Sequence, residues 1–110
     1  MKVIDRIMNK IKQLLPLTSS QERSVKMAVA EYGAVASHDS KVSEEALSVL
    51  AESEMLIDRE LDKIQKELNF TPEQRTAIRY LMADYAMSAV MDSDTLEEAN
   101  NMCMEHEEND

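Results

Sequence analysis

The sequence has few of the residues that make turns and few aromatic side chains. Its 110 residues include one glycine, two prolines, three tyrosines, one phenylalanine and no tryptophan. A protein with many strands needs glycine and proline for tight turns, whereas Ala, Leu, Met, Glu and Lys favour helix. We therefore expect an all-α protein with a core of Leu, Ile, Val, Met and Ala side chains.

Disulfides and long apolar runs are also missing. Cys103 is the single cysteine, so no intrachain disulfide can form and nothing in the composition calls for an oxidising compartment. The N-terminal stretch MKVIDRIMNKIKQLL has charged residues at five positions, which breaks the apolar run that a signal peptide or membrane span requires. We expect a cytoplasmic protein.

Charge is distributed unevenly, and basic residues are absent from the C-terminal end. The net charge is −10 overall, but residues 1–17 have four basic groups against one acid, whereas residues 92–110 have eight acids and no base. Residues 43–69 have eight acids and three bases. Binding to phosphates requires a concentrated basic face, so we do not expect direct binding to nucleic acid.

Apolar spacing and capping signals predict one small, bundle-like domain of four to five helices over residues 1–110. The predicted helices cover about 3–15, 20–36, 43–68, 72–91 and 94–105, followed by a frayed acidic tail at about 106–110. The helix over 43–68 would be the long central one, since 26 residues would span about 39 Å.

Local signals predict where two of these helices begin. Thr71 and Gln74 form a capping box with Pro72 at the first helical position, and the string SSQE at 19–22 predicts a second box with Ser19 and Glu22. Gly33, inside the second helix, predicts a point of close approach by a neighbouring helix.

The helix at 3–15 is amphipathic, with a basic polar face. Such a helix can pack in its own domain, dock on a partner or lie on a membrane surface. We expect it to pack in the domain.

The helix at 43–68 contains a heptad-like seam. Its members follow alternating three- and four-residue spacings, with a glutamate at one apolar position: Leu47, Leu50, Glu54, Ile57, Leu61, Ile64 and Leu68. The seam is either an ordinary core stripe or the contact of a homodimer.

Sites of chemistry are poorly supported. Counted from Asp92, an EF-hand loop would place Glu97 where glycine is required and Cys103 where glutamate is required, so capping explains Asp92 and Asp94 better than calcium does. Cys103 and His106 alone are too few ligands for zinc. No phosphate-binding glycine loop or nucleophile constellation is present, so we expect no enzyme, catalytic residue, metal or cofactor.

Acid and methionine occur together near the C-terminus. Flexible thioethers adapt to irregular apolar partners and carboxylates attract basic ones, so this combination is typical of a surface that grips a basic amphipathic helix. The candidate residues are Asp94, Glu97, Glu98, Met87, Met91, Met102, Met104, Glu105, Glu107 and Glu108. Of the methionines, we expect Met87 and Met104 to be exposed.

The sequence therefore predicts a non-catalytic acidic helical binding protein, an inhibitor or adaptor of a protein with a basic surface. Carboxylates on helices can imitate the phosphates of a duplex, so one version has a nucleic-acid-handling protein as partner. Small acidic helical proteins of phages and mobile elements are similar in size and charge balance, which is analogy alone. The alternatives are a structural protein that forms a homo-oligomer through the seam of residues 47–68, and a membrane-surface protein anchored by residues 3–15.

Overall fold

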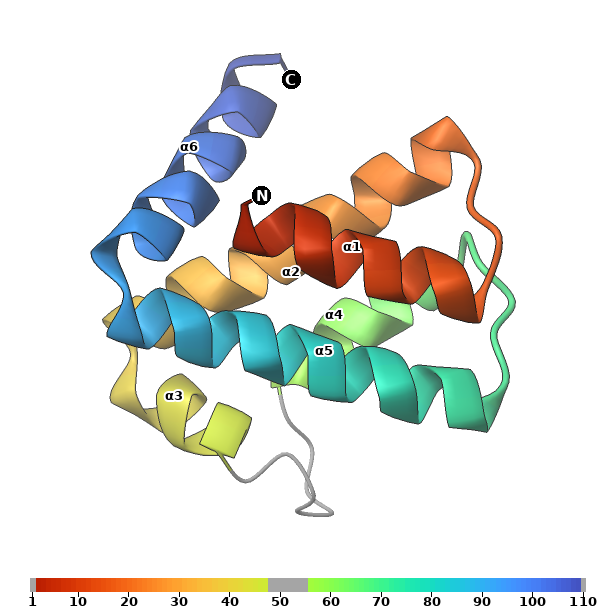
Figure 1. Ribbon diagram of the computed structural model, residues 1–110, viewed down its shortest axis with the longest axis horizontal. Helices are drawn as coiled ribbons and strands as arrows, with labels where there is room; N and C mark the ends of the chain where they lie inside the picture. The colour runs from red at the N-terminus through yellow and green to blue at the C-terminus, as the bar shows by residue number, and fades with distance from the viewer. Residues whose placement is uncertain (1, 48–55, 110) are drawn as a thin grey trace.

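The computed structural model describes the backbone of residues 2–47 and 56–109, and the side chains of residues 2–46 and 57–103. This part of the chain consists of helices and short connections and contains no strand, which confirms the all-α prediction (Figure 1). It contains six helices, more than the four or five predicted. They are α1 (Val3–Leu14), α2 (Ser19–His38), α3 (Ser40–Leu47), α4 (Leu56–Gln65), α5 (Pro72–Met91) and α6 (Ser93–Asn109).

Helix α1 packs in its own domain, as expected. Its apolar face is buried, with Ile4 and Ile7 at 2% and 0% exposure, and Met8 and Ile11 complete that face. Leu15 follows in an extended conformation because the next residue is a proline, whose ring disfavours helical geometry in the residue before it. The apolar face of α1 is therefore covered by the protein itself.

Two capping boxes start the two longest helices. The box at Thr71 and Gln74 is confirmed: the Thr71 hydroxyl accepts from the Gln74 N–H at 3.1 Å, and the Gln74 side chain accepts from the Thr71 N–H at 2.9 Å. The box predicted at Ser19 and Glu22 is wrong by one residue, since Thr18 and Gln21 form it.

The glutamines of both boxes make further contacts. The Gln21 amide also donates to the Glu67 carbonyl at 3.4 Å, and the Gln74 amide to the Leu14 carbonyl at 2.9 Å. Each box therefore also ties the start of its helix to the end of another.

Helices α2 and α5, with 20 residues each, are the long helices at the centre of the molecule. They approach closely at Gly33, where a Cβ atom would lie 2.8 Å from Cε1 of Tyr85 and 3.6 Å from Cβ of Ala89. Tyr85 is fully buried at this crossing. The prediction of a close packing point at Gly33 is confirmed.

The single long helix predicted over residues 43–68 corresponds to two separate helices, α3 and α4, with residues 48–55 outside the described part. The Glu45 carboxylate of α3 accepts the backbone N–H of Ile57 in the first turn of α4 at 3.2 Å. In one continuous helix these two residues would lie about 18 Å apart along the axis, beyond the reach of a glutamate. A carboxylate at a helix N-terminus also complements the helix dipole.

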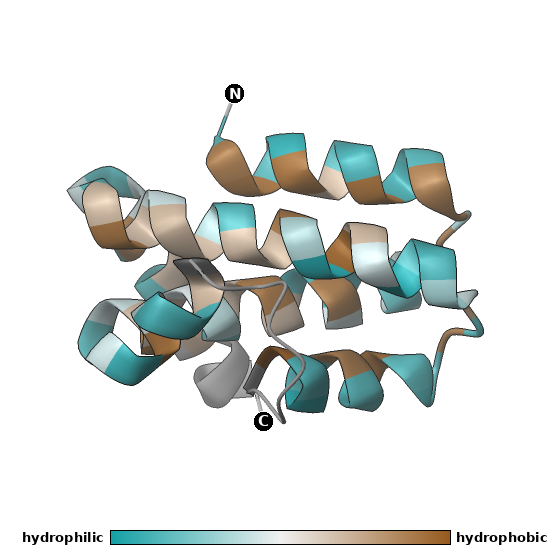
Figure 2. Cartoon of the chain, turned by 90° about the horizontal axis from the view of Figure 1, so that it is seen from below, coloured by the Kyte–Doolittle hydropathy of each residue, from teal (hydrophilic) through white to brown (hydrophobic). Residues whose placement is uncertain are grey.

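One core joins all six helices. Figure 2 shows the hydrophobic stripes of the ribbons turned towards neighbouring helices and the hydrophilic stripes turned outward. The largest fully buried side chains are Tyr32, Tyr85, Ile4, Ile7, Ile11, Ile57, Leu61, Ile78, Met82, Val25, Val29 and Thr95. Two tyrosines thus contribute to a core that composition alone assigned to aliphatic residues.

Candidate functional site

The acidic segment begins where α5 passes into α6, and Asp92 organises that corner. Its carboxylate accepts the Asp94 N–H at 3.1 Å through Oδ1 and the Thr95 hydroxyl at 3.0 Å through Oδ2. Asp92 therefore caps α6, as the sequence predicted when capping was preferred to calcium binding. Helix α6 continues to Asn109, so its predicted end at residue 105 is too early.

Among the predicted acidic residues, Asp94 and Glu97 are exposed, but Glu98 is only partly so. The Glu98 carboxylate accepts the backbone N–H of Ile4 at 3.0 Å and the hydroxyl of Tyr85 at 3.4 Å. Burial and the Glu98 charge raise the pKa of Tyr85 well above its usual value. Glu98 thus holds the start of α1 and the core tyrosine of α5, and its prediction as a partner-binding residue is not supported by this position.

The predicted methionines divide between surface and core. Met91 is 81% exposed at the end of α5. Met87 and Met102 are half-buried and pack against the core, so the expectation that Met87 is exposed is wrong. The side chains of Met104, Glu105, Glu107 and Glu108 lie outside the described residues.

Three exposed residues near these positions were not predicted. They are Tyr80 at 43% and Val90 at 42% exposure, and Asp84, which is also exposed. Tyr80 and Asp84 lie one helical turn apart and continue the face that leads to Met91. The signal was the spacing of 80, 84, 87 and 91, which share one face of a helix and of which the sequence prediction named only Met87 and Met91.

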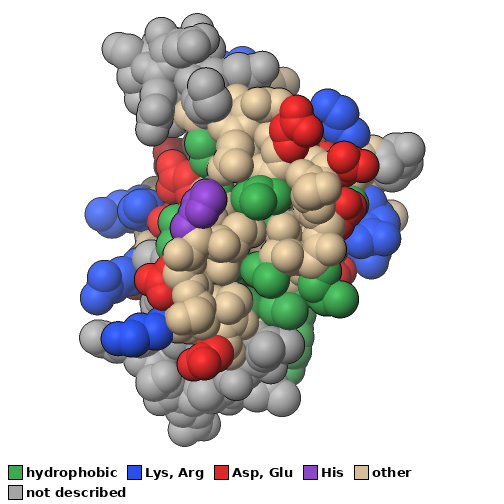
Figure 3. All heavy atoms as spheres, turned by 90° about the vertical axis from the view of Figure 1, so that its left-hand side faces the viewer, with side chains coloured by type: hydrophobic (Ala, Val, Ile, Leu, Met, Phe, Trp, Pro, Cys, Tyr) green, Lys and Arg blue, Asp and Glu red, His purple; other side chains and the backbone are tan. Residues whose placement is uncertain are grey.

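Figure 3 shows the end of the molecule where α5 meets α6. Hydrophobic side chains gather on this face beside acidic ones, with a histidine among them, and Lys and Arg side chains lie towards the edges of the view. No lysine or arginine follows Arg79 in the sequence. Residues 80–110 therefore supply no lysine or arginine to the exposed apolar and acidic groups of this end.

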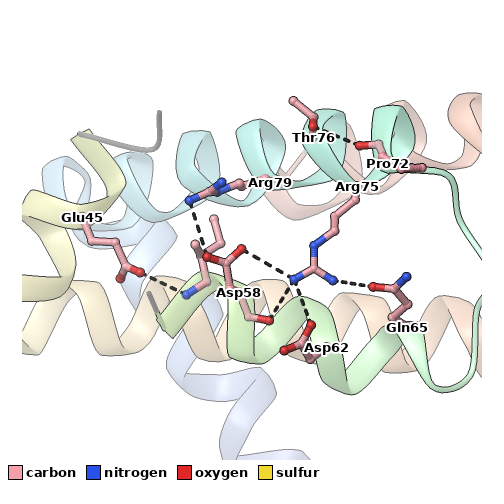
Figure 4. A network of polar contacts seen from close by, with 9 residues as sticks. Glu45, Asp58, Asp62, Gln65, Pro72, Arg75, Thr76 and Arg79 are labelled. Atoms are coloured by element: carbon pink, nitrogen blue, oxygen red, sulfur yellow. Dashed lines mark hydrogen bonds and ion pairs between the residues drawn. The ribbon is translucent and has the colours of Figure 1, made fainter. Parts of the chain in front are cut away.

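A network of ion pairs joins α4 to α5 away from this end (Figure 4). Arg75 contacts Asp62 at 2.9 Å and Asp58 at 3.6 Å, and Arg79 contacts Asp58 at 3.5 Å. Arg75 also donates to Gln65. These contacts use both arginines of α5 to hold α4. We therefore assign the network a role in stabilising the fold.

Tyr32 lies buried beside this network. Burial and the neighbouring Glu45 carboxylate raise the pKa of Tyr32 far above its usual value. Its hydroxyl is fully buried and makes no hydrogen bond of standard geometry within the described residues. Glu45 and Tyr32 together place polar groups of α3 and α2 against the first turn of α4.

A cleft of about 250 Å³ lies between α2 and α4. At its edge Glu60 is only 6% exposed and pairs with Lys63 at 3.2 Å. Burial raises the pKa of Glu60 above 4.5, and the Glu31 carboxyl opposite adds to this rise, whereas Lys63 opposes it. Arg23 and Glu67 complete the charged lining, so the cleft is lined by both cations and carboxylates.

A second cavity, of about 340 Å³, lies where the start of α1 meets α2 and α6. Lys2 and Lys26 line it together with Glu98 and Asn101. The Glu98 carboxylate already accepts the backbone N–H of Ile4. The cavity is thus a polar junction between helices.

The described members of the predicted seam are core residues. Ile57, Leu61, Ile64 and Leu68 are between 0% and 4% exposed within a single chain. The side chain of Leu47 and all of Leu50 and Glu54 lie outside the described residues. The four described side chains are therefore not available for contact with a second copy.

The described residues contain neither a metal-binding cluster nor a membrane-spanning helix. In that part of the chain, no three His, Cys, Asp or Glu side chains gather where they could hold a metal ion. No helix there is both long enough and apolar enough to cross a membrane. Cys103 is half-buried, and the side chain of His106 lies outside the described part.

Comparison of the chain with models of protein families, with curated proteins and with solved structures gives no match.

Proposed function

We propose that this protein is a non-catalytic binding protein that engages a basic protein surface through the end of the molecule where α5 passes into α6. The proposed contact, called here the α5–α6 surface, consists of Val90, Met91, Asp94 and Glu97. The observation that carries the proposal is Met91, which is 81% exposed and is followed in the chain by the exposed residues Asp92 and Asp94. A large exposed apolar side chain is informative when it joins a patch of one charge.

Charge supports a basic partner. Asp94 and Glu97 are exposed and have no ion pair among the described contacts of residues 2–46 and 57–103. Some other acids are paired inside the molecule: Asp58 and Asp62 hold arginines of α5, and Glu22 pairs with Lys12 at 3.1 Å. The α5–α6 surface therefore offers unneutralised charge, which speeds the encounter with a basic protein.

The partner we propose is a protein, and an inhibitor or adaptor role follows from occupying its basic surface. A nucleic-acid-handling protein is one such partner, since its basic groove accepts arrays of negative charge. We propose a cytoplasmic setting, which the single cysteine favours. Burial of the four described seam residues and of the apolar face of α1 supports this proposal over the oligomer and membrane alternatives.

The test is binding of a fluorescent, lysine-rich peptide without helical periodicity, measured by anisotropy at low and at physiological salt. The informative variant is Asp94→Asn with Glu97→Gln. Asp92 and Glu98 are left intact, because the first caps α6 and the second holds α1. A matched control, Asp5→Asn with Glu67→Gln, removes the same charge from exposed positions elsewhere.

The proposal predicts that the informative variant weakens binding by about three- to tenfold at low salt, as loss of two exposed charge contacts would. The control should bind like the unmodified protein, apart from the small effect of net charge. Equal weakening by both variants would show that only net charge matters and would contradict the α5–α6 surface.

A further inference from the structure

The outer face of α5 has a line of side chains that are exposed or only half-buried. Tyr80, Asp84, Met87 and Met91, called here the α5 stripe, occur at positions i, i+4, i+7 and i+11 and so share one face of the helix. Tyr80 is 43% and Met91 81% exposed, whereas Met87 is half-buried between them. The stripe is a shallow apolar line with one carboxylate in the middle.

The packing of α5 explains why this line is open. The opposite face of α5 is buried, and its side chains there include Ile78, Met82, Tyr85 and Ala89. In Figure 1, α1 lies above α5 and α3 lies below it, and neither crosses its front. One side of α5 is thus left uncovered by α1 and α3 (Figure 1), and Tyr80, Asp84 and Met91 are exposed there.

The charge along this side has a single sign. Glu73 at the start of the helix and Asp84 in its middle are exposed, and Asp94 follows just beyond its end. Arg75 and Arg79, the two bases of α5, turn to the other side and pair with Asp58 and Asp62 of α4. The stripe therefore combines apolar contact with uncompensated acid.

A second copy of the chain does not fit this stripe. Contact of two α5 helices across a two-fold axis would set the same patch on both subunits. Asp84 and Glu73 would then meet a face that also has only carboxylates. Like charges brought together cost free energy, so the occupant must carry the opposite charge.

We propose that the α5 stripe is the docking face for a basic amphipathic helix of the partner protein. This inference rests on the proposed function and names the element that the partner contributes. The apolar side of such a helix would cover Tyr80 and Met91, and its lysines or arginines would face Asp84 and Asp94. Tyrosine and methionine suit this role, since one supplies a rigid amphipathic surface and the other adapts to its partner.

Two synthetic peptides of identical composition test the inference. One has leucine and lysine spaced so that a helix of about four turns has one apolar and one basic face, and the other has the same residues in an order without helical periodicity. Binding of each to the full chain is measured by isothermal titration calorimetry. The stripe variant is Tyr80→Ala with Met91→Ala.

The matched control is Leu14→Ala with Val35→Ala, which truncates two apolar side chains of 38% and 39% exposure on α1 and α2. Circular dichroism and the unfolding midpoint establish that both variants fold. We expect the periodic peptide to bind about tenfold more tightly than the aperiodic one, and the stripe variant to remove this preference, as truncation of interface anchors does. The control variant should retain it.

The outcomes separate the two proposals. Equal binding of both peptides, unaffected by the stripe variant but weakened by Asp94→Asn with Glu97→Gln, would overturn the helix-docking inference and leave the acidic binding function standing. Absence of binding by either peptide at low salt would overturn both.

Discussion

Gly33→Ala is the substitution for which helix propensity and packing predict opposite changes in the free energy of unfolding. Glycine inside a helix costs about 0.5–1 kcal/mol relative to alanine, so propensity alone predicts that the variant is more stable. In the structure the new Cβ would lie 2.8 Å from Cε1 and 2.9 Å from Cδ1 of Tyr85, well inside ordinary contact. Tyr85 is fully buried, so its ring has no free space to move into.

Overpacking of this kind costs about 1–3 kcal/mol, which exceeds the propensity gain over most of that range. We therefore expect Gly33→Ala to lower the free energy of unfolding by about 1 kcal/mol. Urea denaturation followed by circular dichroism measures the change, and an unchanged slope would assign it to the native state.

The control removes the ring that the new methyl meets. In a Tyr85→Ala background, Gly33→Ala should stabilise by about 0.5–1 kcal/mol, because only the propensity difference remains. Stabilisation by Gly33→Ala in the unmodified protein would refute the close crossing of α2 and α5.

Three further predictions test other parts of the account. Leu61→Ala should lower stability by about 2–5 kcal/mol because the side chain is fully buried, and a loss under about 0.5 kcal/mol in urea denaturation would contradict this position. Thr71→Ala should lower stability by about 1 kcal/mol, because the Gln74 N–H loses its acceptor. The control Thr76→Ala, at an exposed position of the same helix, should change stability by less than about 0.5 kcal/mol. Equal losses in both variants would show that Thr71 does not cap the helix. Glu60→Gln should be more stable than the unmodified protein at neutral pH and similar to it below about pH 4. Folding raises the pKa of the Glu60 carboxyl above 4.5, so ionisation of this buried group at higher pH lowers the stability of the unmodified protein, whereas glutamine stays neutral. A stability difference between this variant and the unmodified protein that is independent of pH would contradict this reasoning.

Features set by neighbouring residues could be predicted from the sequence. The capping box at Thr71 depends on four consecutive residues, and the burial of α1 follows from its three- and four-residue spacing. The box at the start of α2 shows the limit of such signals. Thr18 with Gln21 and Ser19 with Glu22 have almost the same pattern, and Glu22 instead pairs with Lys12 of α1.

Features set by residues far apart in the chain could not be predicted from the sequence. The contact of Glu45 in α3 with the Ile57 N–H in α4 shows that these two helices are not one continuous helix, and no local sequence pattern indicates this contact. Glu98 looked like one more tail acid, yet it bonds to Ile4, 94 residues earlier in the chain. No local pattern distinguishes it from Glu97, which is exposed.

The exposure of the candidate site was predicted only in part. The sequence placed it on the C-terminal acids and methionines, and Met91, Asp94 and Glu97 are indeed exposed. Tyr80 and Asp84 were missed because exposure of the α5 stripe depends on where α1 and α3 lie. The side chains of residues 104–109 lie outside the described part, so their share in the surface stays a prediction.

The most direct test of the central claim is a map of where a basic helix binds. Two-dimensional ¹H–¹⁵N spectra of the full chain, recorded during titration with the periodic peptide, report each backbone amide separately. We predict that the largest shifts occur at Tyr80, Asp84, Met91 and Asp94, and that amides lining the α2–α4 cleft, such as Glu31 and Lys63, change little. The largest shifts in that cleft, or uniform small shifts over all acidic residues, would contradict the claim that the outer face of α5 receives a basic partner.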